Sequence, residues 1–193
     1  MEALEIKLLD YKINWRKKER GIEITIDGHT INTADKVTLN PVWGSGVDSV
    51  NFANFLKEVK VYETAQLVGF VLTNTPCTGL ACDINYQLIY DLKSQKESYF
   101  GRFRTGFEFE LYHFNADDFP DYLSKTFYGR NAQQIDTTEF VMYSQTENGD
   151  FQQFQTATQS KYWFKHICSV SNDDFENESF EEHWVEKINV YDK

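Results

Sequence analysis

Apolar and polar residues alternate in several short stretches of the chain, which is the spacing of β-strands with one buried face. Residues 22–26 have the sequence Ile-Glu-Ile-Thr-Ile, and residues 84–92 and 107–111 repeat the alternation with aromatic and aliphatic side chains. Residues 67–72 are almost continuously apolar, which favours a central strand covered on both faces. These stretches predict a protein built largely from strands.

Turn residues divide the strands. Asp27-Gly28 can take the positive φ values of a type I′ turn, so residues 21–32 are predicted to form a hairpin with His29 opposite Ile26. Asn148-Gly149 is a second hairpin signal, although it leaves the register open. Between residues 4 and 13 the apolar positions change phase once, which predicts a first strand containing a bulge.

Three segments carry the signals of short helices. Apolar residues at helical spacing predict a helix over 49–60. A second is expected over 118–128, with Asp118 as its cap and Gly129 after its end. A third is expected over 179–188, where Ser179 and Glu182 match a capping box and the apolar positions are Phe180, Trp184 and Ile188. The segment 158–170 fits either period, and we interpret it as helical.

The sequence therefore predicts an α+β fold: a largely antiparallel sheet of about six to eight strands with a few short peripheral helices. An all-β sandwich with short helices is the alternative. At 193 residues the chain has the length of one domain, and no linker-like segment divides it, so we expect a single globular domain over 1–193.

Acidic residues outnumber basic ones and are unevenly distributed. The formal net charge is −11, whereas residues 1–20 carry +2, so the remainder carries −13. The last 22 residues contain eight carboxylates against two lysines, interleaved with four large aromatic residues. Such a surface repels nucleic acid and anionic membrane and suits a basic protein partner. Asp117, Asp118 and Asp121 are expected to extend the same patch. The residues expected to bind the partner are Asp117, Asp118, Asp121, Glu178, Glu181, Glu182 and Glu186.

Motifs for catalysis and for cofactors are missing from the sequence. There is no Gly-x-Ser-x-Gly, no glycine-rich phosphate loop and no regular calcium loop, and the four histidines are scattered. We therefore expect a non-enzymatic protein without a cofactor. A hydrolase assembled from distant residues such as His113, Asp117 and Cys168 is one alternative.

Three cysteines, an odd number, are typical of a reducing compartment, and no apolar run is long enough to span a membrane, so we expect a cytoplasmic protein. Cys77 and Cys82 could contribute to a zinc site only together with Cys168 and His166, and ordinary thiols are the simpler interpretation. Residues 15–20 form the one basic cluster, which we interpret as a solvated loop.

The favoured hypothesis is an acidic protein that binds a basic partner, in the form of an inhibitor or immunity-type protein that neutralises a nucleic-acid-directed protein. A small-molecule or carbohydrate-binding β module is the second alternative, because several aromatic side chains could stack on a ligand. The candidate stacking residues are Tyr86, Tyr90, Tyr99, Phe103 and Tyr112.

Overall fold

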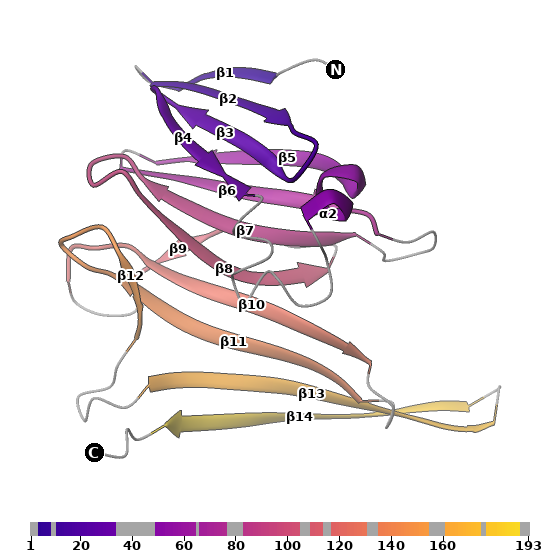
Figure 1. Ribbon diagram of the computed structural model, residues 1–193. Helices are drawn as coiled ribbons and strands as arrows, with labels where there is room; N and C mark the ends of the chain where they lie inside the picture. The colour runs from indigo at the N-terminus through magenta and orange to yellow at the C-terminus, as the bar shows by residue number, and fades with distance from the viewer. Residues whose placement is uncertain are drawn as a thin grey trace. The chain divides into compact units, whose positions relative to one another are not determined.

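The computed structural model divides the chain into two compact units, residues 1–109 and residues 110–193 (Figure 1). It describes residues 4–8, 11–33, 49–64, 66–76, 83–104, 109–113, 117–130, 135–154, 161–174 and 177–189. The single domain expected from the chain length stays a prediction.

The first sheet of unit 1 contains strands β1 (Leu4–Leu8), β2 (Tyr11–Lys17), β3 (Ile22–Ile26) and β4 (His29–Asn32), paired antiparallel in that order. Asp27 and Gly28 have φ values of 46° and 88°, and Ile26 pairs with His29, so the predicted hairpin is confirmed. The prediction of one bulged strand over residues 4–13 is wrong, because the change of phase separates two paired strands.

The second sheet of unit 1 contains β5 (Leu56–Glu63), β6 (Leu67–Asn74), β7 (Ile84–Asp91) and β8 (Lys96–Arg104), paired in that order. The short helix α2 (Ser49–Phe55) directly precedes β5 in the chain. The helix expected over 49–60 is right only as far as Phe55. There the Phe55 carbonyl accepts a hydrogen bond from the Thr75 N–H at 2.9 Å, and the chain continues as a strand. Every residue of β6 is buried, which confirms the predicted central strand covered on both faces.

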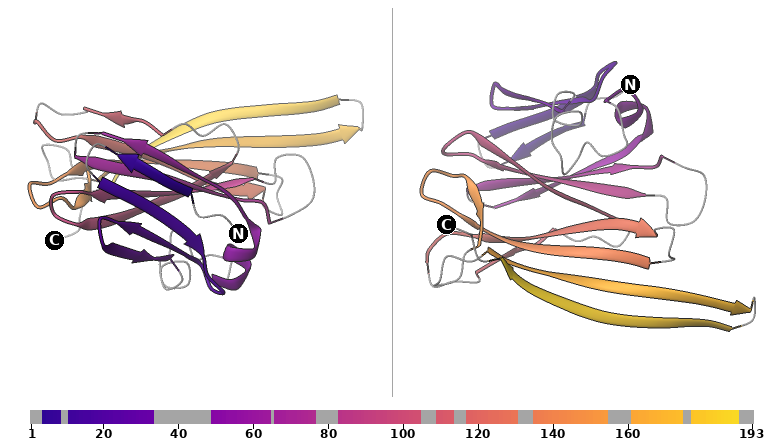
Figure 2. Two further views of the ribbon diagram at one scale, coloured as in Figure 1. Left: turned by 90° about the horizontal axis from the view of Figure 1, so that it is seen from above. Right: turned by 60° about the horizontal axis from the view of Figure 1, so that its bottom comes forward.

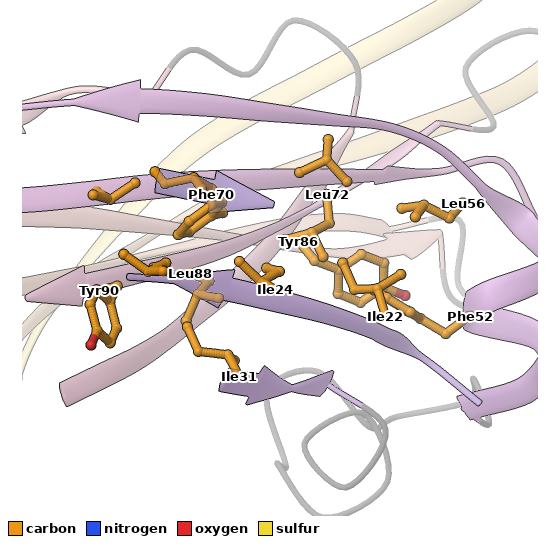
Figure 3. Packing of buried hydrophobic residues seen from close by; sticks show 14 residues of the cluster. Ile22, Ile24, Ile31, Phe52, Leu56, Phe70, Leu72, Tyr86, Leu88 and Tyr90 are labelled. Carbon is orange, nitrogen blue, oxygen red and sulfur yellow. The ribbon is translucent and has the colours of Figure 1, made fainter. Parts of the chain in front are cut away.

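The two sheets of unit 1 face each other across one hydrophobic core (Figure 3). The first sheet contributes isoleucines from alternate positions of β2, β3 and β4, and the second contributes aliphatic and aromatic residues of α2, β5, β6 and β7. Phe52 and Tyr86 pack edge to face with ring centroids 4.9 Å apart. Each large side chain fully removed from water contributes about 1.5–3 kcal/mol, so this core is the main source of stability in unit 1.

On the face of β6 that points away from this core, Gly69 lies under the aromatic ring of Phe109. A Cβ atom at Gly69 would lie 2.6 Å from two ring carbons of Phe109, which is closer than real Cβ atoms approach. The Phe109 ring also stacks on Tyr62, with centroids 5.2 Å apart. Only glycine at position 69 leaves room for this ring.

A buried threonine joins the two ends of the β3–β4 hairpin. Thr33 Oγ1 accepts a hydrogen bond from the Ile22 N–H at 2.8 Å and donates one to the Ile22 carbonyl at 3.1 Å. Replacing Thr33 by valine keeps the shape but leaves both backbone groups without the hydroxyl, so we expect a loss of about 2–4 kcal/mol in the free energy of unfolding. Denaturant unfolding measures this loss. Thr30→Val, at an exposed position of the same hairpin, is the control and should change stability by less than about 0.5 kcal/mol.

Unit 2 contains one antiparallel sheet. Its strands are β9 (Leu111–Tyr112), β10 (Asp121–Arg130), β11 (Ile135–Gln145), β12 (Phe151–Gln153), β13 (Lys161–Asp174) and β14 (Asn177–Asn189). The order across the sheet is β14-β13-β11-β10-β9, and β12 pairs with the end of β11. Asn148-Gly149 lies in the β11–β12 connection, with Gly149 at a φ of 82° and Gln145 paired with Phe151, so the second hairpin is also confirmed.

The helices expected over 118–128 and 179–188, and the helical interpretation of 158–170, are wrong: residues 121–128 lie in β10, 179–188 in β14 and 161–170 in β13, while 158–160 lie outside the described residues. A helix of ten or so residues is marginal without tertiary support, and caps add only a little. Each of these segments instead joins a long ladder: eight residue pairs link β10 to β11, and thirteen link β13 to β14.

The fold class is therefore corrected. The described residues form three antiparallel sheets with very little helix, which fits the all-β alternative better than the α+β fold. They also contain more strands than the six to eight expected. No helix in this part of the chain has the length and apolar character needed to cross a membrane.

Candidate functional site

The two units differ sharply in charge. Residues 110–193 contain 16 Asp and Glu against 6 Lys and Arg, a net charge of −10. Residues 1–109 contain 14 Asp and Glu against 13 Lys and Arg, a net charge of −1, which completes the −11 of the whole chain. Any electrostatic attraction for a basic partner is therefore concentrated in unit 2.

The strongest concentration of acidic residues lies at the far end of the β13–β14 strand pair. β11 pairs with β13 only from Trp163 to Ser169, so the residues of β13 after Ser169 pair with β14 alone among the described strands. The strand pair consequently continues past the ends of β10 and β11 (Figure 2). Residues 170–182, called the acidic hairpin below, contain six Asp and Glu and no Lys or Arg.

Four of the seven expected partner-binding residues, Glu178, Glu181, Glu182 and Glu186, lie on β14, the last strand of the sheet. A helix would have gathered Glu178, Glu181 and Glu182 on one side, whereas successive positions of a strand alternate between the two faces. Glu178, Glu182 and Glu186 therefore belong to one face and Glu181 to the other. Backbone pairing places Glu182 opposite Cys168 and Glu186 opposite Phe164.

The other three expected residues lie at the opposite end of the sheet. Asp117 and Asp118 are exposed, and Asp121 is completely buried at the start of β10. Six residue steps lead from Asp121 to Phe127 along β10, and the cross-strand pairs connect Phe127 to Trp184 on β14. Six more steps lead from Trp184 to Glu178, so the two ends lie twelve steps, or about 40 Å, apart along the strands. The structure therefore does not bring these three aspartates together with the acidic hairpin. The partner-binding role of all seven residues stays a prediction.

Asp117 has a local structural role as well. Its carboxylate accepts a hydrogen bond from the Phe119 N–H at 2.9 Å, which is the turn-forming contact that aspartate commonly makes. The sequence prediction named Asp118 as the cap of a helix here, whereas the contact is made by Asp117 and the element that follows is a strand.

A hollow of about 390 Å³ lies beside the β11–β12 hairpin of unit 2. Its lining includes the acidic residues Asp117 and Glu147, the phenylalanines Phe119 and Phe154, and hydroxyl and amide side chains of the hairpin. No Lys, Arg or His is among the described residues of this lining. Asn148-Gly149 revealed the hairpin in the sequence, but nothing in the sequence pointed to the hollow, because residues 117–119 and 144–154 meet only through the sheet.

The basic cluster of residues 15–20 lies partly in β2 and is partly neutralised in the structure. Arg16 Nη2 and Lys18 Nζ lie 2.5 and 3.0 Å from the two carboxylate oxygens of Glu23. The hydrogen bond from Lys18 is the main reason that the pKa of Glu23 is lowered, and Arg16 lowers it further. A phosphate backbone would compete with Glu23 for both cations.

The residues proposed for carbohydrate stacking are only partly accessible. Tyr86 and Tyr90 are buried in the core of unit 1 and cannot stack on a ligand. Tyr112 is half-buried, and its hydroxyl donates a hydrogen bond to the Glu110 carboxylate. Desolvation and that contact raise the pKa of Tyr112 to about 12.

The register also separates the residues of the hydrolase alternative. Cys168 pairs with Asp136, and Asp136 pairs with Arg130. Arg130 is the last residue of β10, whereas Asp121 is the first. His113 and Asp117 lie in the segment that precedes Asp121. About nine residue steps, or roughly 30 Å, therefore separate Cys168 from that segment along the ladder. Among the described residues no group of three His, Cys, Asp or Glu could hold a metal ion, and Cys77 and Cys82 lie outside them.

Comparison with known proteins finds no family model, no curated protein and no solved structure that matches the chain.

Proposed function

We propose that this chain is a non-enzymatic binding protein whose acidic hairpin binds a basic region of another protein. The observation that carries the proposal is the position of the charge. Unit 2 holds −10 of the net −11, the acidic hairpin has no basic residue, and among the described strands its residues beyond Ser169 pair only between β13 and β14. A strand pair that continues past its sheet can enter a groove of the partner that a flat sheet face cannot enter.

The concrete form of the proposal is an inhibitor or immunity-type protein that neutralises a nucleic-acid-directed partner. From Asn177 to Glu182 the hairpin is about 17 Å long at the usual rise of a strand. The described part of this hairpin carries Asp173, Asp174, Glu178, Glu181 and Glu182. That is about one carboxylate per 3.4 Å, which matches the axial spacing of phosphates along one DNA strand. A groove that binds a phosphate backbone would therefore meet a similar density of negative charge.

This mode of binding depends on electrostatic attraction more than on buried area. Complementary charge accelerates association and excludes wrong partners, and salt weakens it. The near-neutral unit 1 adds little to the attraction. We assign it no contact with the partner.

The proposal is tested by capture of partners on the immobilised full chain, with duplex DNA as a competitor. We expect a stoichiometric basic protein that is retained at low salt, elutes as salt rises and is displaced by the DNA. Displacement is the decisive step, because it shows that the chain and the nucleic acid compete for the same groove. A partner that resists both salt and DNA, or no retained partner at low salt, would contradict the proposal.

A further inference from the structure

The hollow beside the β11–β12 hairpin has the chemistry of a receptor for a cationic side chain. Asp117 and Glu147 are exposed acidic residues at its wall, and Phe119 and Phe154 are partly buried aromatic ones. Among the described residues no Lys, Arg or His lines the hollow, so the charged groups of its described wall are all negative. A ligand that carries positive charge would therefore enter favourably.

A buried acceptor lies in the same wall. Thr146 Oγ1 is shielded from solvent and has no hydrogen-bond partner in the structure. The Thr146 backbone is fixed, because its N–H donates to the Asp150 carbonyl and its carbonyl accepts from the Gly149 N–H, both at 2.8 Å. A buried hydroxyl without a partner costs free energy, so the wall of the hollow contains one unsatisfied polar position.

We propose that this hollow binds an arginine side chain of the basic partner, an inference that rests on the proposed function. A guanidinium group has five N–H donors in a flat fork and no acceptor, which suits a wall of carboxylate, amide and hydroxyl oxygens. Its flat face can also stack on Phe119 or Phe154. A lysine ammonium has a single compact charge and would meet fewer of these groups at once.

A neutral sugar fits the wall less well. It could also hydrogen-bond to the glutamines and stack on a phenylalanine. It would, however, shield Asp117 and Glu147 from water without compensating their charge, which is unfavourable. Arginine compensates that charge as it enters.

The inference is tested by titrating the full chain with N-acetyl-L-arginine amide and following backbone amide NMR signals. N-acetyl-L-citrulline amide, which has nearly the same shape without the charge, is the matched ligand control. We expect saturable shifts at residues 145–147 and 153–154 with the arginine probe at millimolar concentration, and at least about tenfold weaker binding of the citrulline probe. Equal binding of the two probes, or no saturable shift at these residues, would overturn the inference.

Two variants locate the probe. Glu147→Gln removes one wall charge and should weaken arginine binding about fivefold or more, whereas Glu63→Gln, at an exposed position of unit 1, should leave it unchanged. Methyl glycosides serve as a further comparison. Saturable shifts with a glycoside and none with the arginine probe would overturn the inference in favour of a sugar site.

The outcome is separable from that of the proposed function. If the partner is captured and displaced by DNA while the arginine probe does not bind, the inference about the hollow fails and the proposed function stands. If the probe binds while no basic partner is retained at low salt, the arginine site is supported and the proposed function fails.

Discussion

Replacing Glu178, Glu181 and Glu182 together by lysine should weaken binding of the basic partner about 100-fold at low salt. Each substitution removes one attraction and introduces one repulsion, and each such exposed term is worth about 0.5 kcal/mol. Six terms of this size sum to about 3 kcal/mol, which corresponds to roughly a 100-fold change in the dissociation constant. Calorimetric titration at two salt concentrations measures the change, and the difference from the wild type should shrink as salt rises.

A charge-matched control separates the position of the charges from the total charge. Glu19, Glu58 and Glu63 are exposed residues of unit 1, and their replacement by lysine changes the net charge by the same amount. This control should lower affinity several-fold at most. Equal losses in the two triple variants would show that net charge, and not the acidic hairpin, controls binding. A circular dichroism melt of each variant confirms that the strands are retained.

Raising the pH from 10 to 12 should destabilise the protein through Tyr99 and Tyr122, by at most about 2.7 kcal/mol for each phenol that stays protonated in the folded chain. Burial raises the pKa of both phenols well above the ordinary value of 10.0. In the unfolded chain both ionise near pH 10, whereas the folded chain keeps them protonated. Above pH 10 the unfolded state therefore binds fewer protons than the folded state, and the free energy of unfolding falls as pH rises.

Absorbance at 295 nm, which reports tyrosinate, together with far-ultraviolet circular dichroism, measures this effect. We expect the exposed tyrosines to ionise first and the buried ones to ionise only when the strand signal is lost. Tyr122→Phe removes one of the phenols whose pKa is strongly raised and should reduce the alkaline loss of stability. Ionisation of all eleven tyrosines near pH 10 with the strand signal intact would contradict the burial of these side chains.

Charge and short strands were readable from the sequence. The type I′ hairpin followed from Asp27-Gly28, and the central strand followed from the continuous apolar run that became β6. Both signals are local, because a turn type needs two particular residues and a strand buried on both faces needs only apolar ones. The concentration of carboxylates near the C-terminal end was equally plain, since it requires only counting.

The helix predictions failed where the spacing of apolar residues was ambiguous. Positions four apart share one side of a helix and also one face of a strand. The apolar residues of both failed helices have this spacing: Phe119, Leu123 and Phe127 in the first, and Phe180, Trp184 and Ile188 in the second. In 49–60 the interval from Phe52 to Phe55 is three, and there the short helix α2 does form. The interval from Leu56 to Val59 is also three, but it lies in β5, where the register shifts between Leu56 and Glu58. Spacing by itself therefore did not separate the helix from the strand that follows it.

The candidate sites were determined only in part by sequence. Counting residues identified the acidic hairpin by composition, but only strand pairing shows that it continues beyond β11 and that Asp117, Asp118 and Asp121 lie about 40 Å away along the ladder. The hollow near Thr146 depends on the same pairing. By itself the sequence determined the charge, the turns and the buried strand, because each is a property of neighbouring residues. Tertiary structure decided which ambiguous segments became strands and which distant side chains share a site, because the ladder that joins them pairs residues far apart in the chain.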